Sequence, residues 1–270
     1  MKQKKQKLID RLVEMGACGG EREAAARIMA GEVYINGQIA RNGALVKEED
    51  AVTLKGVLPY ASKGGFKLSG ALEDFGVDVR DCVCVDAGAS TGGFTDCLVQ
   101  RGAKMVYAVD VGFGQLMGRL RQDERVVNLE KTNVSDEKLL SLSPRPTLGT
   151  VDVSYLSLRK AVPYFAAILH GEGELVCLVK PLFEIDDAEA RRTGVIDDTQ
   201  YQPLLRGLID DLGALPGVAV RAVTHSPVTG NAGTREFFLH VLLGKGCPAV
   251  TDGEISAAVE RAQKLTVYKK

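Results

Sequence analysis

Four charged residues stand where strand-like or helix-like segments begin or end. Asp152 and Lys180 each end an apolar run, Glu236 opens one, and Lys67 leads into a helical segment. A lysine that ends a run such as LVCLV is partly buried and normally requires a carboxylate partner, although a lysine reaching back to water explains Lys180 alone equally well. Together, two ammonium and two carboxylate groups favour a functional site in which paired charges act on a polar substrate group.

The elements that must bring these residues together are alternating strands and helices. Apolar strands separated by helices predict a parallel sheet covered on both faces. The last two strands are joined without a helix, which favours antiparallel pairing. The expected class is α/β, and the pattern resembles the Rossmann-like, seven-stranded sheet of S-adenosylmethionine-dependent methyltransferases. The expected strands are Cys82–Asp86, Met105–Asp110, Val126–Glu130, Gly149–Val153, Leu175–Lys180, Val218–Thr224 and Phe237–Leu243.

This topology predicts where three of the four charged residues meet. Asp152 and Lys180 end parallel strands and emerge at the ligand edge of the sheet. The strand that begins after Glu236 is antiparallel, so its start lies at that same edge. We therefore expect Asp152, Lys180 and Glu236 to converge, with Lys180 held by both acids.

The stretch VDAGASTGGFTDCL follows the pattern of a nucleotide-binding turn with one position changed. Gly88 and Gly93 fill the outer positions of G-x-G-x-x-G, but Ser90 stands at the middle one. Gly88, Gly92 and Gly93 would let a ligand approach the backbone, and a helix N-terminus favours an anionic group such as the carboxylate of S-adenosylmethionine. That cofactor has no pyrophosphate, so the missing glycine matters less. Asp110, ending the second strand, could bind the ribose hydroxyls.

The first 60 residues have a different texture. Helices are expected over Gln6–Met15 and Glu21–Ala30, followed by a hairpin at Asn36-Gly37 and a strand from Ala51. This order resembles an S4 RNA-binding domain, although Gly20-Glu21-Arg22 and Arg41-Asn42-Gly43 depart from the family pattern. A small packing module without RNA contacts is the alternative. The residues that carry the resemblance are Arg11, Arg22, Ala25, Ile28, Gly31, Val33, Asn36 and Gly37.

Five motifs in order extend the resemblance to nearly the whole chain. They are SKGGFKL, VDAGASTGGFTDCL, DVSYLSL, LVKPLFE and GTREFFLH. The set of Lys67, Asp152, Lys180 and Glu236 resembles the Lys-Asp-Lys-Glu tetrad of FtsJ-like RNA ribose 2′-O-methyltransferases. Together with the S4-like part, the chain resembles the TlyA family, also called hemolysin A. That family methylates cytidine 2′-hydroxyls of ribosomal RNA, in the large subunit (23S) and in some members also the small one (16S).

The resemblance implies a domain organisation and a set of binding residues. It implies an S4-like domain over 1–60, a methyltransferase domain over 61–246 with a linker over 57–67, and a tail over 247–270 with a helix from Glu254 to Leu265. A helix is also expected from Ser69 to Phe75. Asn133 would lie near the adenine, but could equally cap a helix from Asp136. The expected cofactor-binding residues are Asp86, Gly88, Ser90, Gly92, Gly93, Phe94, Asp110 and Asn133.

The same resemblance implies roles for the charged residues. Lys180 could orient the ribose 2′-oxygen, and Lys67, or its neighbour Lys63, could hold the ribose or a flanking phosphate. Tyr155 and Phe183 could stack on an extruded base or simply pack in the core. The charged segment from Glu184 to Asp198 is expected to be a mobile flap or an ordinary solvated loop. The expected RNA-binding residues are Arg11, Arg22, Lys63, Arg191 and Arg192.

Composition and charge limit which partners and which cellular compartment are expected. The net charge is −1, so any surface for ribosomal RNA or ribosomal subunits must be local. The basic opening MKQKKQKLID fits either a frayed terminus or an RNA-contacting arm. Cys82 and Cys84 are too close in sequence for ordinary zinc spacing, so they and Cys177 are expected to be core thiols in a reducing cytosol, with no metal site. Without a signal peptide or an 18-residue apolar run, a cytoplasmic protein without a membrane span is expected.

Three other functions remain open from sequence alone. A ribosome-assembly factor could keep the fold and bind RNA without catalysis. The hemolysin label suggests a membrane-lysing protein, which the missing amphipathic segment argues against. A small-molecule methyltransferase would leave the S4-like part unexplained. The sequence does not fix the modified nucleotide, the substrate subunit, the oligomeric state or whether the cofactor binds before RNA.

Overall fold

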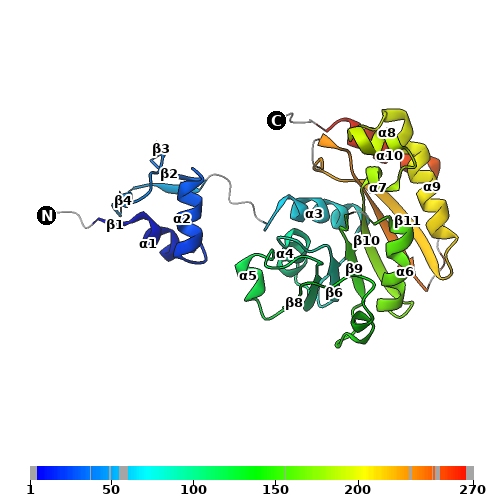
Figure 1. Cartoon of the computed structure of the whole chain (residues 1–270), viewed down its shortest axis with the longest axis horizontal. Helices are drawn as coiled ribbons and strands as arrows, with labels where there is room; N and C mark the ends of the chain where they lie inside the picture. Colours follow the sequence, from blue (N-terminus) through cyan, green and yellow to red (C-terminus); the bar gives the residue numbers. More distant parts are fainter. Residues whose placement is uncertain are drawn as a thin grey trace. The chain divides into compact units, whose positions relative to one another are not determined.

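The chain forms two compact units, residues 1–59 and residues 60–270. The computed structural model describes residues 5–36, 38–48, 50–54, 60–154, 156–230, 233–244, 246 and 250–265 (Figure 1). Each unit has its own hydrophobic core, since one buried cluster draws only on residues 8–54 and two others only on residues beyond 60.

The first unit packs two helices against short strands. Helix α1 (Leu8–Glu14) and helix α2 (Glu21–Met29) bury Leu8, Leu12 and Ile28. The expected hairpin is present, because β2 (Val33–Ile35) pairs antiparallel with β3 (Gln38–Ile39), and Asn36 between them has a φ of 51°. Strand β5 (Val52–Leu54) joins the other edge of β2.

A second pairing in this unit escapes sequence analysis. Strand β1 (Gln6–Lys7) pairs antiparallel with β4 (Leu45–Val46). Two-residue strands are too short to show an alternating apolar pattern, so the sequence does not predict them. Gly37 of the hairpin turn lies outside the described residues.

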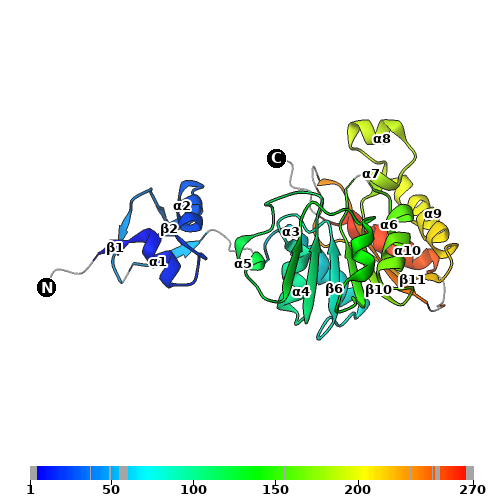
Figure 2. The same ribbon diagram turned by 60° about the horizontal axis from the view of Figure 1, so that its bottom comes forward.

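The second unit contains the predicted seven-stranded sheet (Figure 2). The strand order is β11-β12-β10-β9-β6-β7-β8, and all neighbours from β10 to β8 are parallel. Strand β12 runs antiparallel to both β10 and β11, as the missing crossover helix predicted. The bounds are β6 (Val83–Ala87), β7 (Met105–Val109), β8 (Val126–Leu129), β9 (Leu148–Val151), β10 (Gly173–Val179), β11 (Val218–His225) and β12 (Phe237–Leu243).

Helices cover both faces of this sheet, which explains its apolar strands. Helices α3 (Lys63–Phe75), α4 (Gly93–Gln100) and α5 (Gly118–Arg121) share one buried cluster with the sheet. Helices α6 (Leu158–Ile168), α9 (Tyr201–Gly213) and α10 (Asp252–Gln263) share the other, together with the 3-10 turn η1 (Glu137–Ser141). Among the described residues, no helix is both long and apolar enough to cross a bilayer.

Helix α3 begins six residues earlier than expected. The predicted linker over 57–67 overlaps its first turn, and this part of the prediction is wrong. The Ser62 hydroxyl caps the helix by accepting a hydrogen bond from the Gly64 amide, and Gly76 ends the helix in the left-handed region. The two glycines after Lys63 hid this start, because glycine disfavours helices. Helix α3 therefore carries Lys67 on a rigid element.

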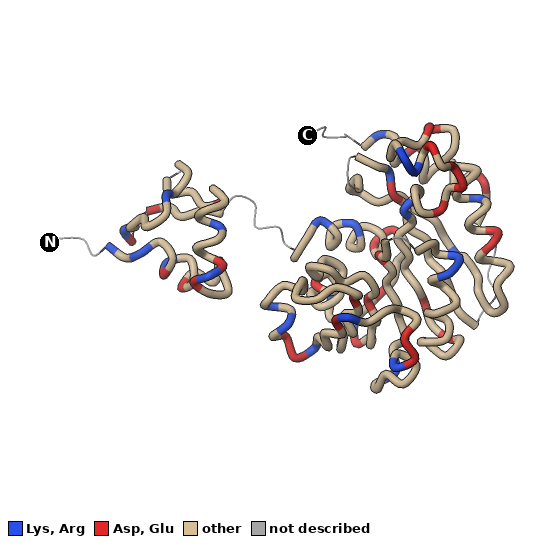
Figure 3. Tube along the Cα trace, in the orientation of Figure 1, with Lys and Arg blue, Asp and Glu red and all other residues tan. Residues whose placement is uncertain are grey.

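The segment from Pro181 to Gln200 contains three short helical elements. They are α7 (Pro181–Glu184), α8 (Ala188–Thr193) and the 3-10 turn η2 (Asp198–Gln200). Asp187 and Asp197 cap α8 and η2 with their side chains. The segment from Glu184 to Asp198, expected to be a mobile flap or a solvated loop, thus contains short helical elements. Basic and acidic positions are interspersed in the described parts of both units (Figure 3).

Candidate active site

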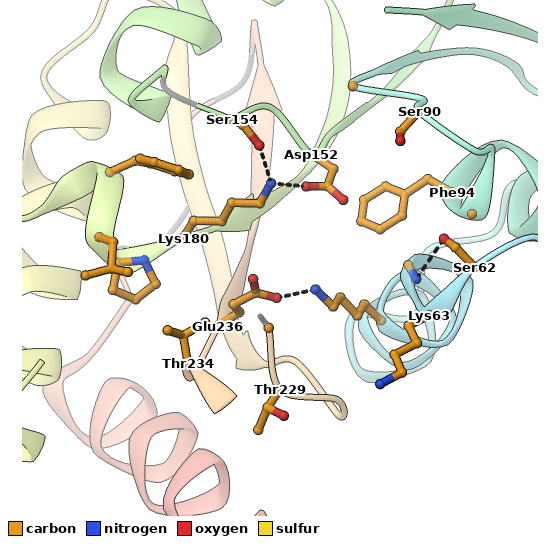
Figure 4. Close-up of a pocket in the computed structure, with 18 of the residues that line it drawn as sticks. Ser62, Lys63, Ser90, Phe94, Asp152, Ser154, Lys180, Thr229, Thr234 and Glu236 are labelled. Carbon is orange, nitrogen blue, oxygen red and sulfur yellow. Dashed lines mark hydrogen bonds and ion pairs between the residues drawn. The ribbon is translucent and has the colours of Figure 1, made fainter. Parts of the chain in front are cut away.

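A cavity of about 590 Å³ opens at the carboxyl ends of β6, β9 and β10 and at the start of β12. Its lining includes all four predicted catalytic residues, Lys67, Asp152, Lys180 and Glu236. The glycine turn and the first residues of α4 form another wall. The close-up shows the side chains of Asp152, Lys180 and Glu236 converging from two strand ends and one strand start (Figure 4). The topology thus gathers the residues as the sequence predicted.

The four charged residues form two ion pairs. Lys180 Nζ lies 2.5 Å from Asp152 Oδ1 and donates a hydrogen bond to the Ser154 hydroxyl at 3.2 Å. Lys67 Nζ lies 2.5 Å from Glu236 Oε2. The expectation that Glu236 also holds Lys180 is wrong, because the longer α3 brings Lys67 directly to Glu236. Each ammonium therefore has its own carboxylate.

The two pairs differ in burial and influence each other. The side chains of Lys67 and Glu236 are 12% and 7% exposed, against 20% and 22% for Lys180 and Asp152. Burial raises the pKa of Glu236, while the neighbouring Lys67 opposes that rise. Asp152 raises and Lys180 lowers the same pKa, so the second pair is close enough to act on the first. The site is one connected charge cluster.

The glycines of the turn make room for protein atoms as well as for a ligand. A Cβ at Gly88, where φ is +85°, would lie 2.2 Å from the carbonyl oxygen of Asp152. A Cβ at Gly92 would collide with Leu120, and one at Gly93 with the Ser62 hydroxyl. Their predicted role as space for ligand approach is therefore incomplete, because these glycines also let β9, α5 and α3 pack against the turn.

Asp110 and Ser90 fix the shape of the turn. The Asp110 carboxylate accepts hydrogen bonds from the Ser90 amide at 2.8 Å and from the Gly112 amide at 2.7 Å. Ser90 has a φ of 48° and lines the cavity, as do Gly88, Gly93 and Phe94. Each carboxylate oxygen retains acceptor capacity, so Asp110 can still bind a ribose.

Four predicted cofactor residues do not line the cavity, namely Gly92 and Asp110 of the turn region, and Asp86 and Asn133. Asp86 is fully buried and accepts hydrogen bonds from the Thr95 and Thr150 hydroxyls at 2.6 and 2.9 Å. Asn133 accepts hydrogen bonds from the amide and hydroxyl of Ser135, so its side chain stabilises a turn. The sequence motif places Asp86 next to the turn but does not show that its side chain points into the core.

The predicted RNA-binding residues occupy three regions. Lys63 is exposed, is the first residue of α3 and lines the cavity. Arg191 and Arg192 lie on α8, where they pair with Asp186 and Glu189. Arg11 and Arg22 belong to the two helices of the first unit.

The cavity also contains residues that sequence analysis did not select. Arg235 binds Asp198, and its guanidinium carbon lies 5.8 Å from the ring centroid of Tyr201. Its position next to Glu236 could have drawn attention to it. Thr229 and Thr234 line the same wall, but threonines in a loop carry no distinctive pattern. Phe183 lines the cavity as well, whereas Tyr155 lies outside the described residues.

The cysteines and acids give no metal site within the described ranges. There, no group of three or more His, Cys, Asp or Glu side chains is arranged to hold a metal ion. Cys84 and Cys177 are fully buried free thiols whose pKa burial raises, which confirms them as core residues. Cys82 is only half-buried.

Known proteins share this sequence and architecture. The FtsJ-like methyltransferase family matches residues 60–242. YqxC of Bacillus subtilis, named as an rRNA methyltransferase, is 38% identical over all of this chain and 98% of its own length. A 16S/23S rRNA (cytidine-2′-O)-methyltransferase TlyA of Mycobacterium tuberculosis is 37% identical over 84% of this chain and 86% of its own. A solved structure from Streptococcus thermophilus, described as a hemolysin, is 34% identical, covers 96% of both chains and has a TM-score of 0.71. The chain therefore belongs to the FtsJ-like methyltransferase family.

Proposed function

We propose that this protein transfers a methyl group from S-adenosylmethionine to the 2′-hydroxyl of a cytidine in ribosomal RNA. The observation that carries the proposal is the cavity in which the Lys180–Asp152 and Lys67–Glu236 pairs face the glycine turn. The relatives named as rRNA methyltransferases support the RNA substrate, and TlyA supports cytidine and the 2′-oxygen.

The chemistry of the donor set fits this cofactor. Asp110 offers carboxylate oxygens for ribose hydroxyls, and the amides at the start of α4 suit the carboxylate of the methionine part. Phe94 supplies an apolar wall beside them. S-adenosylmethionine supplies an electrophilic methyl group on a sulfonium. Gly88, Ser90, Gly93, Phe94 and Asp110 are the residues that we assign to holding it.

The ion pairs then act on the acceptor oxygen. A ribose hydroxyl is a weak nucleophile until it is oriented and its developing charge is stabilised. Lys180 is fixed by Asp152 and Ser154, so its ammonium can donate a hydrogen bond in a set direction. Because each ammonium is already paired with a carboxylate, we assign Lys180 and Lys67 to orientation and charge stabilisation rather than to accepting the proton. The hydroxyl proton would be released to water as the oxygen takes up the methyl group. Holding the oxygen in line with the methyl group contributes much of the rate.

RNA binding is assigned to residues outside this charge cluster. Lys63 stands at the first turn of α3, where a positive side chain opposes the helix dipole and is not explained by helix stability. A phosphate contact explains it better. In the first unit, Arg11 and Arg22 are assigned to RNA contacts of an S4-like domain. A cytoplasmic location would follow from ribosomal RNA as substrate.

Product mapping tests the proposal. Ribosomal subunits and free ribosomal RNA from cells lacking the protein are incubated with the purified chain and methyl-labelled cofactor, then digested to nucleosides. The expected product is 2′-O-methylcytidine, and it should be absent with Lys180→Ala. RNA binding without methyl transfer would instead indicate a non-catalytic assembly factor, and label on a base would contradict the role given to the tetrad.

A further inference from the structure

A fully buried carboxylate, Asp86, connects the start of helix α4 with strand β9 by hydrogen bonds. Asp86 lies on β6, two residues before Gly88, and is 0% exposed. One of its oxygens accepts a hydrogen bond from Thr95 of α4, and the other from Thr150 of β9. Buried carboxylates are costly unless hydrogen-bonded. The backbone pairing of the sheet would be satisfied equally by an apolar residue here, so this charge requires an explanation.

Thr150, which donates one of these hydrogen bonds, lies two residues before Asp152 in the chain. Asp86 and Thr150 are register partners in the parallel pairing of β6 with β9. The Asp152 amide donates to the Ala87 carbonyl at 2.9 Å, and the carbonyl oxygen of Asp152 lies against Gly88. The position of Asp152, and of Lys180 paired with it, is therefore set by how β9 sits against β6.

Thr95, which donates the other hydrogen bond, follows the residues of α4 that line the cavity, Gly93 and Phe94. Thr95 is fully buried in the first turn of α4. The Thr95 backbone also donates a hydrogen bond to Asp86. Asp86 therefore fixes the start of α4 relative to the strand that carries the turn.

We propose that Asp86 is a positioning residue that aligns the cofactor wall with the Asp152–Lys180 pair through separate bonds to Thr95 and Thr150. This inference rests on the proposed methyl transfer. It replaces the expected direct contact of Asp86 with cofactor. Thr150 serves the reacting pair, and Thr95 serves cofactor binding.

Electrostatics give this residue a pH signature. Burial raises the pKa of Asp86 to about 6, the two threonine hydroxyls oppose the rise, and Asp152 adds to it. Asp86 in turn adds to the raised pKa of the Cys84 thiol on the same strand, and Lys180, which directly follows β10, is paired with Asp152. On α4, Asp96 is buried but engaged by Arg119 and by the Ala61 amide. Asp86 is thus charged at pH 8 and largely neutral at pH 5.

Two valine variants separate the two bonds. Thr150→Val should lower kcat for methyl transfer about tenfold and leave the affinity for S-adenosylhomocysteine, measured by calorimetry, within threefold. Thr95→Val should weaken that affinity about tenfold and leave kcat at saturating cofactor within threefold. The matched control is Thr224→Val, which removes another buried threonine hydroxyl from an aspartate, Asp74, outside the cavity. It should change neither quantity more than twofold.

Asp86→Asn adds a readout that a purely structural role would not move. The ratio of wild-type to variant kcat should fall toward 1 between pH 8 and pH 5, because neutral Asp86 resembles asparagine. A ratio that is constant with pH, or valine variants that affect kcat and affinity alike, would overturn the proposal. Thermal melting checks that each variant folds. If the wild type binds S-adenosylhomocysteine but methylates no RNA, the proposed function fails, while the Thr95 result still tests Asp86.

Discussion

At the scale of single residues, the pairing of charges matters more than their presence. Lys67 and Lys180 have the same charge and line the same cavity, but Lys67 is held by the buried Glu236 and Lys180 by the more exposed Asp152 and Ser154. The more accessible pair is the one we assign to the ribose oxygen. We assign the more buried Lys67 to the same orientation and charge stabilisation from a more enclosed position.

Removing one member of the buried pair should cost more than removing both. Lys67→Ala leaves the Glu236 charge without its partner in a buried position, so we expect a loss of about 3–5 kcal/mol in the free energy of unfolding. Lys67→Ala combined with Glu236→Gln should recover more than half of that loss. Urea denaturation measures both. Equal losses for the single and double variants would show that Glu236 does not depend on Lys67.

Asp86 should make stability depend on pH in a defined direction. Its pKa is raised from 3.8 to about 6 in the folded protein, so the folded state binds this proton more tightly than the unfolded state. The contribution of this proton binding to the free energy of unfolding is fully present below pH 3.8 and is lost as the pH rises through 6. From pH 5 to pH 8, wild type should lose about 1 to 1.5 kcal/mol relative to Asp86→Asn. Urea denaturation at both pH values measures this difference in the free energy of unfolding. A wild type that gains stability relative to Asp86→Asn as the pH rises would contradict the buried position of this carboxylate.

At the scale of elements, the strands and the antiparallel pairing of the last one could be predicted, but the start of helix α3 could not. Each expected strand of the second unit is present within two residues, because buried parallel strands have long apolar runs. The start of α3 was missed because its first turn contains two glycines and depends on the Ser62 cap. The site followed the same rule: strand ends placed Asp152 and Lys180, but the partner of Glu236 depended on where α3 begins.

The contact between α3 and α4 gives a prediction at this scale. An added Cβ at Gly93 would lie 2.2 Å from the Ser62 hydroxyl and 3.0 Å from the Gly65 amide nitrogen. Gly93→Ala should therefore push the two helix starts apart, weaken cofactor affinity at least about tenfold and destabilise the fold by about 1–3 kcal/mol. Calorimetry and thermal melting measure these effects.

Gly207→Ala is the control for this substitution. Gly207 lies in α9 with no atom within 4 Å of an added Cβ, so alanine should stabilise the helix by about 0.5–1 kcal/mol and leave cofactor affinity unchanged. If Gly93→Ala behaves like Gly207→Ala, the close approach of α3 and α4 does not shape the cofactor wall.

At the scale of the whole molecule, the chain has two units with separate cores, to which we assign different parts of the proposed function. Every residue that lines the cavity belongs to residues 60–270. Residues 60–270 alone should therefore bind cofactor as the full chain does. Without the first unit, KM for ribosomal RNA should rise at least about tenfold, and with fewer phosphate contacts it should depend less on salt, while kcat stays within about threefold. An unchanged KM would remove the first unit from RNA recognition.

The most direct test of the central claim compares two lysines on the same protein. Lys180→Ala should lower kcat for 2′-O-methylation of ribosomal RNA by at least about 100-fold, since it removes a group that acts on the oxygen in the transition state. Lys160→Ala, on the exposed face of α6 outside the cavity, should stay within twofold. Both should bind S-adenosylhomocysteine within threefold of wild type. A Lys180→Ala protein that keeps more than a tenth of the activity would contradict the account.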